Sequence, residues 1–348
     1  GTWGSTSGNI TIGAATGLVT GINAGTAVVT YSLGSGCNAT AIITVNPLPA
    51  ALTGPTQVCE SSCITLASTS GGGTWASSNT AVGTVNTTGV VCGVAAGTTN
   101  ITYTLGTGCR RVQTITVNAL PAAIAGAGSV CVNQCTILSS SPAGGTWASS
   151  NTAVGTINAG GNFCGVSFGT TTVTYTAPTT GCIRTTVMAV NPLPTGISPV
   201  APQVCEGSCT PVTGSPGGGI WTSSNPAVGS ITSAGSFCGV TAGTTTLTYT
   251  MGSGCFMTVT GTVNSVPTPV TGTLTVCVNS TTTLSATPAG GTWSSPSGNV
   301  TVNSTTGEVT GNTAGTATIS YTVGTGCRST AVVTVLALPA AITGTPSV

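Results

Sequence analysis

Apolar and polar residues alternate in short runs along this chain, and residues 47–118 illustrate the pattern. A period of two is typical of β-strands that bury one face. Strict alternation at 100–105 and 112–117, with Gly106-Thr107-Gly108 between them, predicts a β-hairpin. Shorter runs at 57–68, 74–76 and 82–94 are separated by Gly, Asn and Ser, which favour turns. We therefore predict an all-β fold, with about seven short strands in these residues forming an antiparallel β-sandwich.

The pattern recurs five times, and aromatic residues mark each copy. The tryptophans and the tyrosines are spaced by 72, 72, 74 and 72 residues, and each tyrosine follows its tryptophan by 28 residues. The pairs are Trp3 and Tyr31, Trp75 and Tyr103, Trp147 and Tyr175, Trp221 and Tyr249, and Trp293 and Tyr321. This period is too long for the common helical repeats and suits a small sandwich domain.

We therefore expect tandem immunoglobulin-like repeats of about 72 residues. Repeat 1 (1–46) is partial and lacks its first strands, and 337–348 is a linker into a next repeat. Repeats 2 to 5 cover residues 47–118, 119–191, 192–264 and 265–336. Since the chain starts and stops inside the pattern, we expect it to be part of a longer polypeptide.

The paired aromatic residues have two possible roles. They could fill the core of each sandwich, or they could form a surface platform on which sugars stack. We expect core packing for Trp75, Tyr103 and their equivalents in repeats 3 to 5, since a repeat of this size has few other large apolar side chains. Phe163 and Phe237 precede a recurring cysteine and are expected to be structural, whereas Phe168 and Phe256 have no such context.

Charged residues are almost absent, which excludes many functions. The chain contains four Arg and three Glu, with no Lys, Asp or His. It therefore has no histidine for a catalytic triad or a metal site, no lysine for a Schiff base and no aspartate for a calcium site. Four scattered arginines do not form a basic surface for nucleic acid. We expect no catalytic, cofactor-binding or metal-binding residues, and we predict that the chain is not an enzyme.

Membrane insertion is also unexpected, because no uninterrupted apolar run approaches the length of about 18 residues that a spanning helix needs. We expect the charged side chains beside the outer cysteines, which are Glu60, Glu206, Arg110 and Arg328, to face solvent.

Two segments of repeat 2 resemble a known family. Residues 73–86 (GTWASSNTAVGTVN) and 89–103 (GVVCGVAAGTTNITY) are similar to the bacterial Ig-like group 2 domain, as are 307–311 (GEVTG) and 314–321 (AGTATISY) of repeat 5. The resemblance extends over all five repeats. It implies an immunoglobulin-like fold and a spacer or adhesive role at a bacterial surface, and it brings no catalytic residues. The many cysteines and the near absence of charge depart from an ordinary member.

The cysteines predict a disulfide framework, and repeat 5 indicates its inner bridges. Repeats 2 to 4 each have four cysteines, which allow three pairings. In repeat 5, Thr281 and Thr310 replace the second and third cysteines together, as expected for partners. We therefore predict inner bridges between the second and third cysteines, which are Cys63–Cys92, Cys135–Cys164 and Cys209–Cys238.

The remaining two cysteines of each repeat would then form an outer bridge. These bridges would be Cys59–Cys109, Cys131–Cys182, Cys205–Cys255 and Cys277–Cys327. Cys37 is left unpaired, because its partner position would precede Gly1. A four-cysteine zinc site is the alternative, but repeat 5 would then have only two ligands. Disulfides indicate an oxidising, extracellular location.

A surface with so little charge should self-associate unless something else solvates it. O-glycans on Thr and Ser would do so, and we expect such modification without assigning sites. Asn-x-Ser/Thr sequons also occur, but in a chain rich in Ser and Thr they arise by chance. They lie at Asn9, Asn38, Asn86, Asn100, Asn279, Asn299 and Asn303.

Three functions remain at this stage. The first is a structural role, as a rigid stalk or extracellular fibre whose partners are adjacent repeats or copies of itself; Pro-containing linkers at Pro47, Pro121 and Pro192 favour it. The second is an adhesin whose repeats bind glycans or a host protein. The third is an accessory domain of a secreted enzyme, for which these residues contain no supporting feature.

Overall fold

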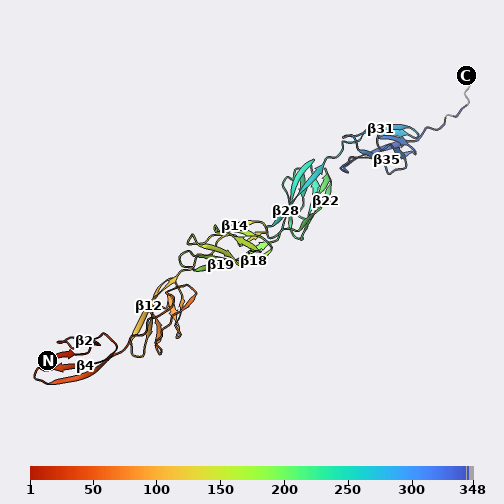
Figure 1. Ribbon diagram of the computed structural model, residues 1–348. Helices are drawn as coiled ribbons and strands as arrows, with labels where there is room; N and C mark the ends of the chain where they lie inside the picture. Colours follow the sequence, from red (N-terminus) through yellow and green to blue (C-terminus); the bar gives the residue numbers. More distant parts are fainter. Residues whose placement is uncertain (342, 345–348) are drawn as a thin grey trace. The chain divides into compact units, whose positions relative to one another are not determined.

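The structure is a computed structural model that describes residues 1–341, 343 and 344 (Figure 1). The expected linker at 337–348 therefore lies partly outside the described residues. The chain divides into two compact units, Gly1–Val190 and Asn191–Val348. The first unit contains repeats 1 to 3 and the second contains repeats 4 and 5. Every sheet is built from strands of a single expected repeat, and no helix occurs among the described residues.

Repeat 2 shows the complete architecture, a sandwich of two sheets. Its strands are β6 (Gln57–Cys59), β7 (Cys63–Thr65), β8 (Thr74–Ser77), β9 (Gly83–Val85), β10 (Val90–Gly93), β11 (Gly97–Thr104) and β12 (Arg110–Asn118). One sheet has the order β6-β12-β11-β8 and the other β7-β10-β9. The central hairpin of β11 and β12 pairs Thr104 with Arg110 at its closed end and Gly97 with Val117 at its open end. The all-β sandwich predicted from the alternation is confirmed.

One strand pair departs from the antiparallel prediction. The short strand β6 runs parallel to β12, with Gln57 opposite Thr116, Val58 opposite Val117 and Cys59 opposite Asn118. The first cysteine of the repeat therefore lies beside the last residue of its last strand. This placement decides the disulfide pattern described below.

Repeats 3 to 5 keep the strand orders of the two sheets of repeat 2. Repeat 3 has β13 (Ser129–Cys131), β14 (Cys135–Ile137), β15 (Thr146–Ser149), β16 (Gly155–Ile157), β17 (Asn162–Gly165), β18 (Gly169–Thr176) and β19 (Ile183–Asn191). Repeat 4 has β20 (Gly196–Ser198), β21 (Gln203–Cys205), β22 (Cys209–Pro211), β23 (Thr213–Ser215), β24 (Ile220–Ser223), β25 (Gly229–Ile231), β26 (Ser236–Gly239), β27 (Gly243–Thr250) and β28 (Phe256–Asn264). Repeat 5 has β29 (Thr271–Gly272), β30 (Thr275–Cys277), β31 (Thr281–Ser285), β32 (Thr292–Ser294), β33 (Val300–Val302), β34 (Glu308–Gly311), β35 (Gly315–Thr322) and β36 (Arg328–Leu336). Repeat 4 adds the strand pair β20-β23, and repeat 5 adds β29 beside β31.

Repeat 1 is incomplete in both sheets. Its strands are β1 (Thr2–Ser5), β2 (Ile10–Ile12), β3 (Val19–Gly21), β4 (Gly25–Ser32) and β5 (Asn38–Val45). They form a sheet of order β1-β4-β5 and a pair β2-β3. The counterparts of β6 and β7 are missing, as the partial repeat expected from the sequence requires.

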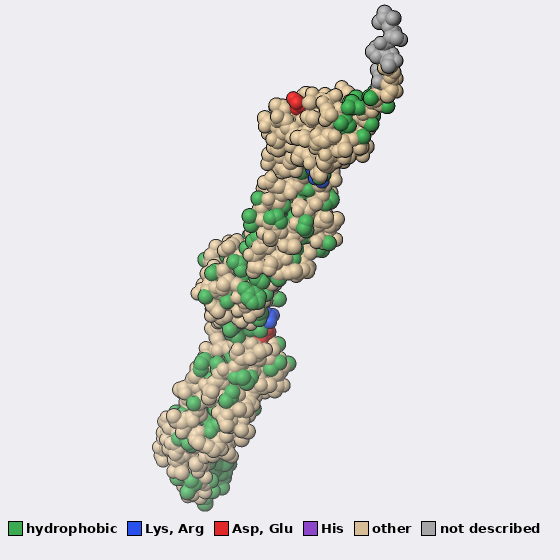
Figure 2. All heavy atoms as spheres, turned by 90° about the vertical axis from the view of Figure 1, so that its right-hand side faces the viewer, with side chains coloured by type: hydrophobic (Ala, Val, Ile, Leu, Met, Phe, Trp, Pro, Cys, Tyr) green, Lys and Arg blue, Asp and Glu red, His purple; other side chains and the backbone are tan. Residues whose placement is uncertain are grey.

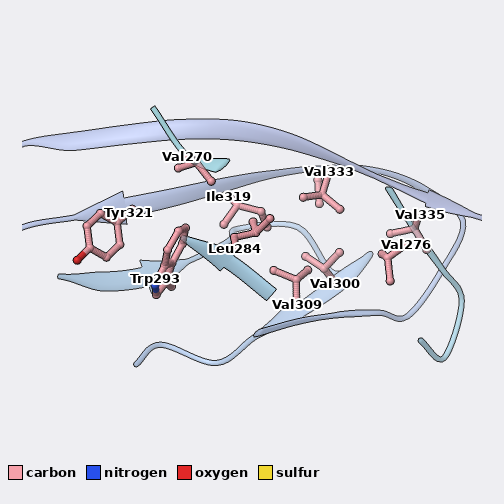
Figure 3. Close-up of a cluster of buried hydrophobic side chains, with 11 residues drawn as sticks. Val270, Val276, Leu284, Trp293, Val300, Val309, Ile319, Tyr321, Val333 and Val335 are labelled. Carbon is pink, nitrogen blue, oxygen red and sulfur yellow. The ribbon is translucent and has the colours of Figure 1, made fainter. Parts of the chain in front are cut away.

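The core of each repeat lies between its two sheets, and the paired aromatic residues belong to it, as predicted. Tyr103 is 5% exposed and packs against Trp75, with ring centroids 4.7 Å apart. The tyrosines of repeats 3 to 5 are buried, and so are Trp221 and Trp293. Figure 3 shows Trp293 and Tyr321 beside Leu284, Ile319 and valines from both sheets of repeat 5. Trp75 and Trp147 are only partly buried, and the paired rings of repeats 3 to 5 line pockets at the surface.

The tyrosine hydroxyl also fixes the turn that precedes the tryptophan. In repeat 2, Tyr103 Oη donates a hydrogen bond to the carbonyl oxygen of Ser70 (2.6 Å) and accepts one from the amide of Gly73 (2.9 Å). Gly89, with φ of 83°, covers Trp75 on its other side, where a Cβ would come within 2.4 Å of the Leu66 carbonyl oxygen. A glycine is needed there because the backbone approaches too closely for any side chain.

The surface carries few charges, and Figure 2 shows for one face that red and blue side chains are rare among the green and tan. Phe168 is 70% exposed and Phe256 is 55% exposed, whereas Phe163 and Phe237 are fully buried.

Candidate functional site: disulfides within and between repeats

The inner bridges join neighbouring strands of one sheet. Cys63 of β7 lies directly opposite Cys92 of β10, and their Cα atoms are 4.1 Å apart in a disulfide. The equivalent cysteines of repeats 3 and 4 are also bonded. These bridges are Cys135–Cys164 and Cys209–Cys238. All three inner pairs therefore occur as predicted. In repeat 5, Thr281 lies opposite Thr310 in the same register.

The predicted outer bridges are wrong, because these cysteines join different repeats. Cys59 of repeat 2 is bonded to Cys182 of repeat 3, and Cys205 of repeat 4 is bonded to Cys327 of repeat 5. The four overturned pairs are Cys59–Cys109, Cys131–Cys182, Cys205–Cys255 and Cys277–Cys327. Cys131 and Cys255 are also disulfide-bonded. Cys37, Cys109 and Cys277 are free thiols in the described part of the chain, so Cys37 is unpaired as expected.

The parallel pairing of β6 explains why an outer bridge cannot close within one repeat. Cys59 lies beside Asn118, at the end of β12, whereas Cys109 immediately precedes Arg110 at its start. A strand of nine residues separates the two ends by about 26 Å at ~3.3 Å per residue. A disulfide needs Cα atoms within about 7 Å of each other. The first and last cysteines of one repeat are therefore at opposite ends of the sandwich.

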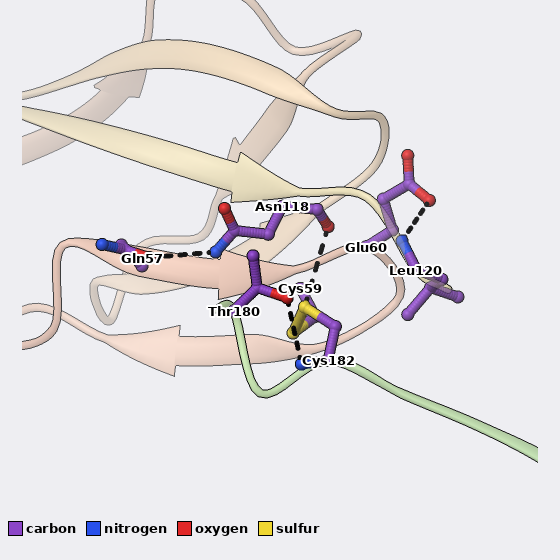
Figure 4. The surroundings of a disulfide bond; sticks show 7 residues. All are labelled: Gln57, Cys59, Glu60, Asn118, Leu120, Thr180 and Cys182. Carbon is purple, nitrogen blue, oxygen red and sulfur yellow. Dashed lines mark hydrogen bonds between the residues drawn. A yellow bond between two sulfur atoms is a disulfide. The ribbon is translucent and has the colours of Figure 1, made fainter. Parts of the chain in front are cut away.

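The last cysteine instead lies close to the end of the preceding repeat. Cys182, in the loop between β18 and β19, has its Sγ atom 4.0 Å from the carbonyl oxygen of Asn118. Because Cys59 pairs with Asn118 in the parallel ladder, its sulfur is within bonding distance of Cys182 (Figure 4). The same placement occurs in the second unit, where Cys327 Sγ lies 3.9 Å from the carbonyl oxygen of Asn264.

In repeats 2 and 4, a glutamate next to the first cysteine holds the linker that leaves the repeat. One carboxylate oxygen of Glu60 accepts a hydrogen bond from the Ala96 amide (2.8 Å) and the other from the Leu120 amide (3.3 Å). Glu206 binds the amides of Ala242 and Val266 in the same way. The expectation that these glutamates only face solvent is therefore wrong. The alternation of apolar and polar residues did not predict that these carboxylates bind backbone amides.

An arginine of the following repeat contacts the same linker. Arg184 donates a hydrogen bond from Nε to the carbonyl oxygen of Pro121 (3.1 Å), and Arg111 makes the equivalent bond to Pro49 (3.0 Å). Asn118 completes the junction by donating from Nδ2 to Oε1 of Gln57 (3.1 Å). The linker between repeats 2 and 3 is thus held by the Glu60 carboxylate and the Arg184 guanidinium, and the Cys59–Cys182 disulfide joins the two repeats beside it.

The cysteines of these sites form disulfide cross-links, within a sheet or between neighbouring repeats. Sulfur atoms in disulfides are not available as the thiolate ligands that zinc requires. Among the described residues, no group of three or more His, Cys, Asp or Glu side chains could hold a metal ion. No helix in the described part of the chain has the length and apolarity to cross a membrane.

Several solved structures align with this chain at low sequence identity. The N-terminal eight immunoglobulin domains of Down syndrome cell adhesion molecule align with 97% of this chain and 56% of their own, at 12% identity and a TM-score of 0.29. Invasin, a bacterial integrin-binding protein, aligns with 89% of this chain and 75% of its own, at 14% identity and a TM-score of 0.29. Domains 1–6 of the surface layer protein SbsC align with 93% and 60%, at 16% identity and a TM-score of 0.21.

Such low scores carry no argument about function, and the chain spans only a little over half of the first of these structures. No curated protein matches the sequence. A family model does match: the bacterial Ig-like domain (group 2) aligns with residues 39–117, which include β6 to β11 and all but the last residue of β12. The resemblance expected from the motifs of repeat 2 is confirmed there: residues 39–117 are similar to the bacterial Ig-like domain of group 2.

Proposed function

We propose that this chain is a structural segment of an extracellular bacterial fibre or stalk, in which successive Ig-like repeats are joined covalently. The observation that carries the proposal is the pair of bridges between repeats, Cys59–Cys182 and Cys205–Cys327. A bridge inside a domain stabilises that domain, whereas a bridge between domains restrains their relative movement. Bridges of the second kind are useful to a protein that must keep neighbouring domains together under load.

The junction between repeats 2 and 3 supports the same role. Its linker is fixed by Glu60 and Arg184 as well as by the disulfide. Linkers that serve only as tethers are flexible and make few contacts with the domains they join. Stable disulfides also require an oxidising compartment, which favours a location outside the cytoplasm.

The surface favours modification or self-association. Only seven side chains are charged, so solubility has to come from another source. We propose that O-glycans on exposed Thr and Ser provide it, and that the partners of the chain are neighbouring repeats or copies of itself. The intact mass of the native material tests the first point, because an unmodified segment of 33.2 kDa would contradict glycosylation.

Electron microscopy of the native material tests the structural role. A continuous filament with a periodicity of one or a few sandwiches is expected. Isolated rods that end in a distinct tip domain would overturn the proposal and favour an adhesin. The adhesin has weaker support in these residues, because the tyrosines of repeats 2 to 5, with Trp221 and Trp293, are buried.

A further inference from the structure

A small surface pocket recurs in repeats 3, 4 and 5. Its volume is about 220, 250 and 190 Å³ in the three repeats. One wall is the glycine-rich turn before the tryptophan, and another is the turn that joins β16 to β17, β25 to β26 or β33 to β34. The paired aromatic residues line each pocket, and they are Trp147 and Tyr175, Trp221 and Tyr249, and Trp293 and Tyr321. The same kind of pocket thus occurs three times along the chain.

Two of these tryptophans are buried and still have an indole N–H without an acceptor. Trp221 and Trp293 are each 5% exposed, and their Nε1 atoms have no hydrogen-bond partner among the described residues. A buried tryptophan usually donates this proton to a partner. In the same part of the chain, no fully buried side-chain nitrogen or oxygen lacks a partner, so these two nitrogens are not sealed in the core. The nitrogen of Trp293 points away from Ile319 (Figure 3). Each indole N–H is therefore a donor that reaches the pocket.

A glycine keeps the space beside each indole nitrogen open. In repeat 4, a Cβ atom at Gly235 would lie 3.1 Å from Trp221 Nε1. Ser233 and Ala234 of the same turn line the pocket. In repeats 3 and 5, the corresponding position beside the indole nitrogen is occupied by Gly161 and Gly307. The indole N–H thus faces the turn that forms one wall of the pocket.

The rest of the lining is polar but uncharged. Each pocket has an exposed hydroxyl without a hydrogen-bond partner among the described residues, and these hydroxyls belong to Ser139, Ser233 and Thr305. No Arg or Glu lines any of the three pockets. A charged ligand would therefore lose its hydration without gaining a counter-charge, and an apolar side chain would leave the indole donor unpaired. This chemistry suits a neutral ligand that is rich in oxygen acceptors.

The volume of the pockets limits the size of such a ligand. Pockets for drug-sized molecules begin at about 300 Å³, so spaces of about 190 to 250 Å³ fit a single ring. A hexopyranose is a ring whose hydroxyl groups donate and accept hydrogen bonds, and its C–H groups can pack against aromatic carbon. Trp147, which is half-buried, also exposes part of its ring to such packing.

We propose that each of these three pockets binds one neutral hexose unit of a glycan. The indole N–H donates a hydrogen bond to a sugar oxygen, and the free Ser or Thr hydroxyl bonds to a second one. In repeats 4 and 5 the edge of the indole makes this contact, not its face. One weak site in each of several repeats gives the chain avidity for a glycan that presents many hexoses. Sugar binding goes beyond the structural role, because a fibre forms with or without it.

The indole N–H signals in nuclear magnetic resonance spectra test the site directly. The full chain is produced without glycans, isotope-labelled on the indole nitrogens, and titrated separately with D-glucose, D-galactose and D-mannose. We expect at least one hexose to shift the signals of Trp147, Trp221 and Trp293. The dissociation constant should be on the order of 1–10 mM, since a single ring makes few contacts. The three Trp→Phe variants at these positions assign the signals.

Acetamide is the control probe, because it offers an acceptor oxygen without a ring of hydroxyls. It should shift the three signals far less than the best hexose at the same concentration. An equal response to acetamide would overturn the proposal. So would the absence of a saturable shift with every hexose up to about 100 mM, which is well above the expected dissociation constant.

A variant that fills one pocket shows where the sugar binds. Ala234 is exposed and lines the pocket beside Trp221, so Ala234→Leu should weaken the response of Trp221 at least about tenfold by steric exclusion. The signals of Trp147 and Trp293 in the same chain should keep their affinities, which also reports an intact fold. Ala227→Leu is the matched control, since Ala227 is exposed in repeat 4 but does not line the pocket. An unchanged response of Trp221 in Ala234→Leu would contradict the site.

The same signals distinguish two sources of the sugar. If O-glycans of the chain or its copies fill the pockets, purified native chain should show shifted signals before any hexose is added, and removal of the glycans should reverse the shift. If the sugar belongs to another polysaccharide, native and glycan-free chains should respond alike to added hexose. Either result supports the pockets as sugar sites. Binding is measured without reference to filaments, so this proposal and the structural role can fail separately.

Discussion

Cys59 and Cys182 are bonded to each other across the boundary between repeats 2 and 3, at a sequence separation of 123. The bond depends on the parallel register that places Cys59 beside Asn118. Repeats 2 and 3, like repeats 4 and 5, are therefore linked twice, by the peptide chain and by a disulfide. This double connection has measurable consequences.

Mapping of disulfides without reduction should find Cys59 with Cys182 and Cys205 with Cys327. The physical reason is the length of β12 and its equivalents, which keeps the first and last cysteines of one repeat about 26 Å apart. The inner pair Cys63–Cys92 serves as an internal control, because it should appear in the same digest. A peptide linking Cys59 to Cys109 would contradict both the register and the bridge.

Stretching of single molecules should show a chain that extends far less when oxidised than when reduced. The bridges Cys59–Cys182 and Cys205–Cys327 close loops with sequence separations of 123 and 122, which shield about 70% of the 348 residues from the applied force. At ~3.5 Å per residue, we expect a contour length of at most about 36 nm in the oxidised chain and about 120 nm after reduction.

Matched variants identify which bridges limit the extension. Cys59→Ser together with Cys205→Ser should lengthen the oxidised chain. Cys63→Ser together with Cys209→Ser should leave it unchanged, since the inner loops lie within the outer ones. An oxidised chain that extends as far as the reduced one would show that the bridges between repeats do not form.

Repeat 5 should accept an inner bridge that it lacks. Thr281 and Thr310 are directly opposite each other, in the register of Cys63 and Cys92. Thr281→Cys with Thr310→Cys should therefore form a disulfide, closing a loop of about 30 residues and stabilising the repeat by about 3.5 kcal/mol in the chain-entropy model. Amide exchange across β31 and β34, with and without reductant, measures the gain. Each single variant is the control, and free thiols in the double variant would contradict the expected geometry.

The inner bridges and the core could be predicted because their evidence is local to one repeat. The paired loss at Thr281 and Thr310 identified partners, and the spacing of Trp75 and Tyr103 identified a recurring core pair. The outer bridges could not be predicted in the same way. Pairing the two remaining cysteines of a repeat assumed that every disulfide joins residues of one repeat, whereas these bridges join different repeats.

The alternation also conceals the direction of β6, since a period of two is the same beside a parallel or an antiparallel neighbour. Without that direction, Cys59 cannot be assigned to one end of the sandwich. The role of Glu60 was hidden for a related reason: its acceptor geometry depends on amides that lie 36 and 60 positions away in sequence.

Removal of the Glu60 carboxylate should loosen the linker that follows repeat 2. Glu60→Ala leaves the amides of Ala96 and Leu120 without their acceptor, and hydrogen bonds to a charged group are worth about 1.5–3 kcal/mol. We expect amide exchange at Leu120 to accelerate about tenfold or more. Glu308→Ala is the matched control, because Glu308 is exposed and its carboxylate has no hydrogen-bond partner in the described part of the chain. If Glu60→Ala and Glu308→Ala changed exchange at Leu120 equally, Glu60 would not hold the linker, and the disulfide and Arg184 would be its only restraints.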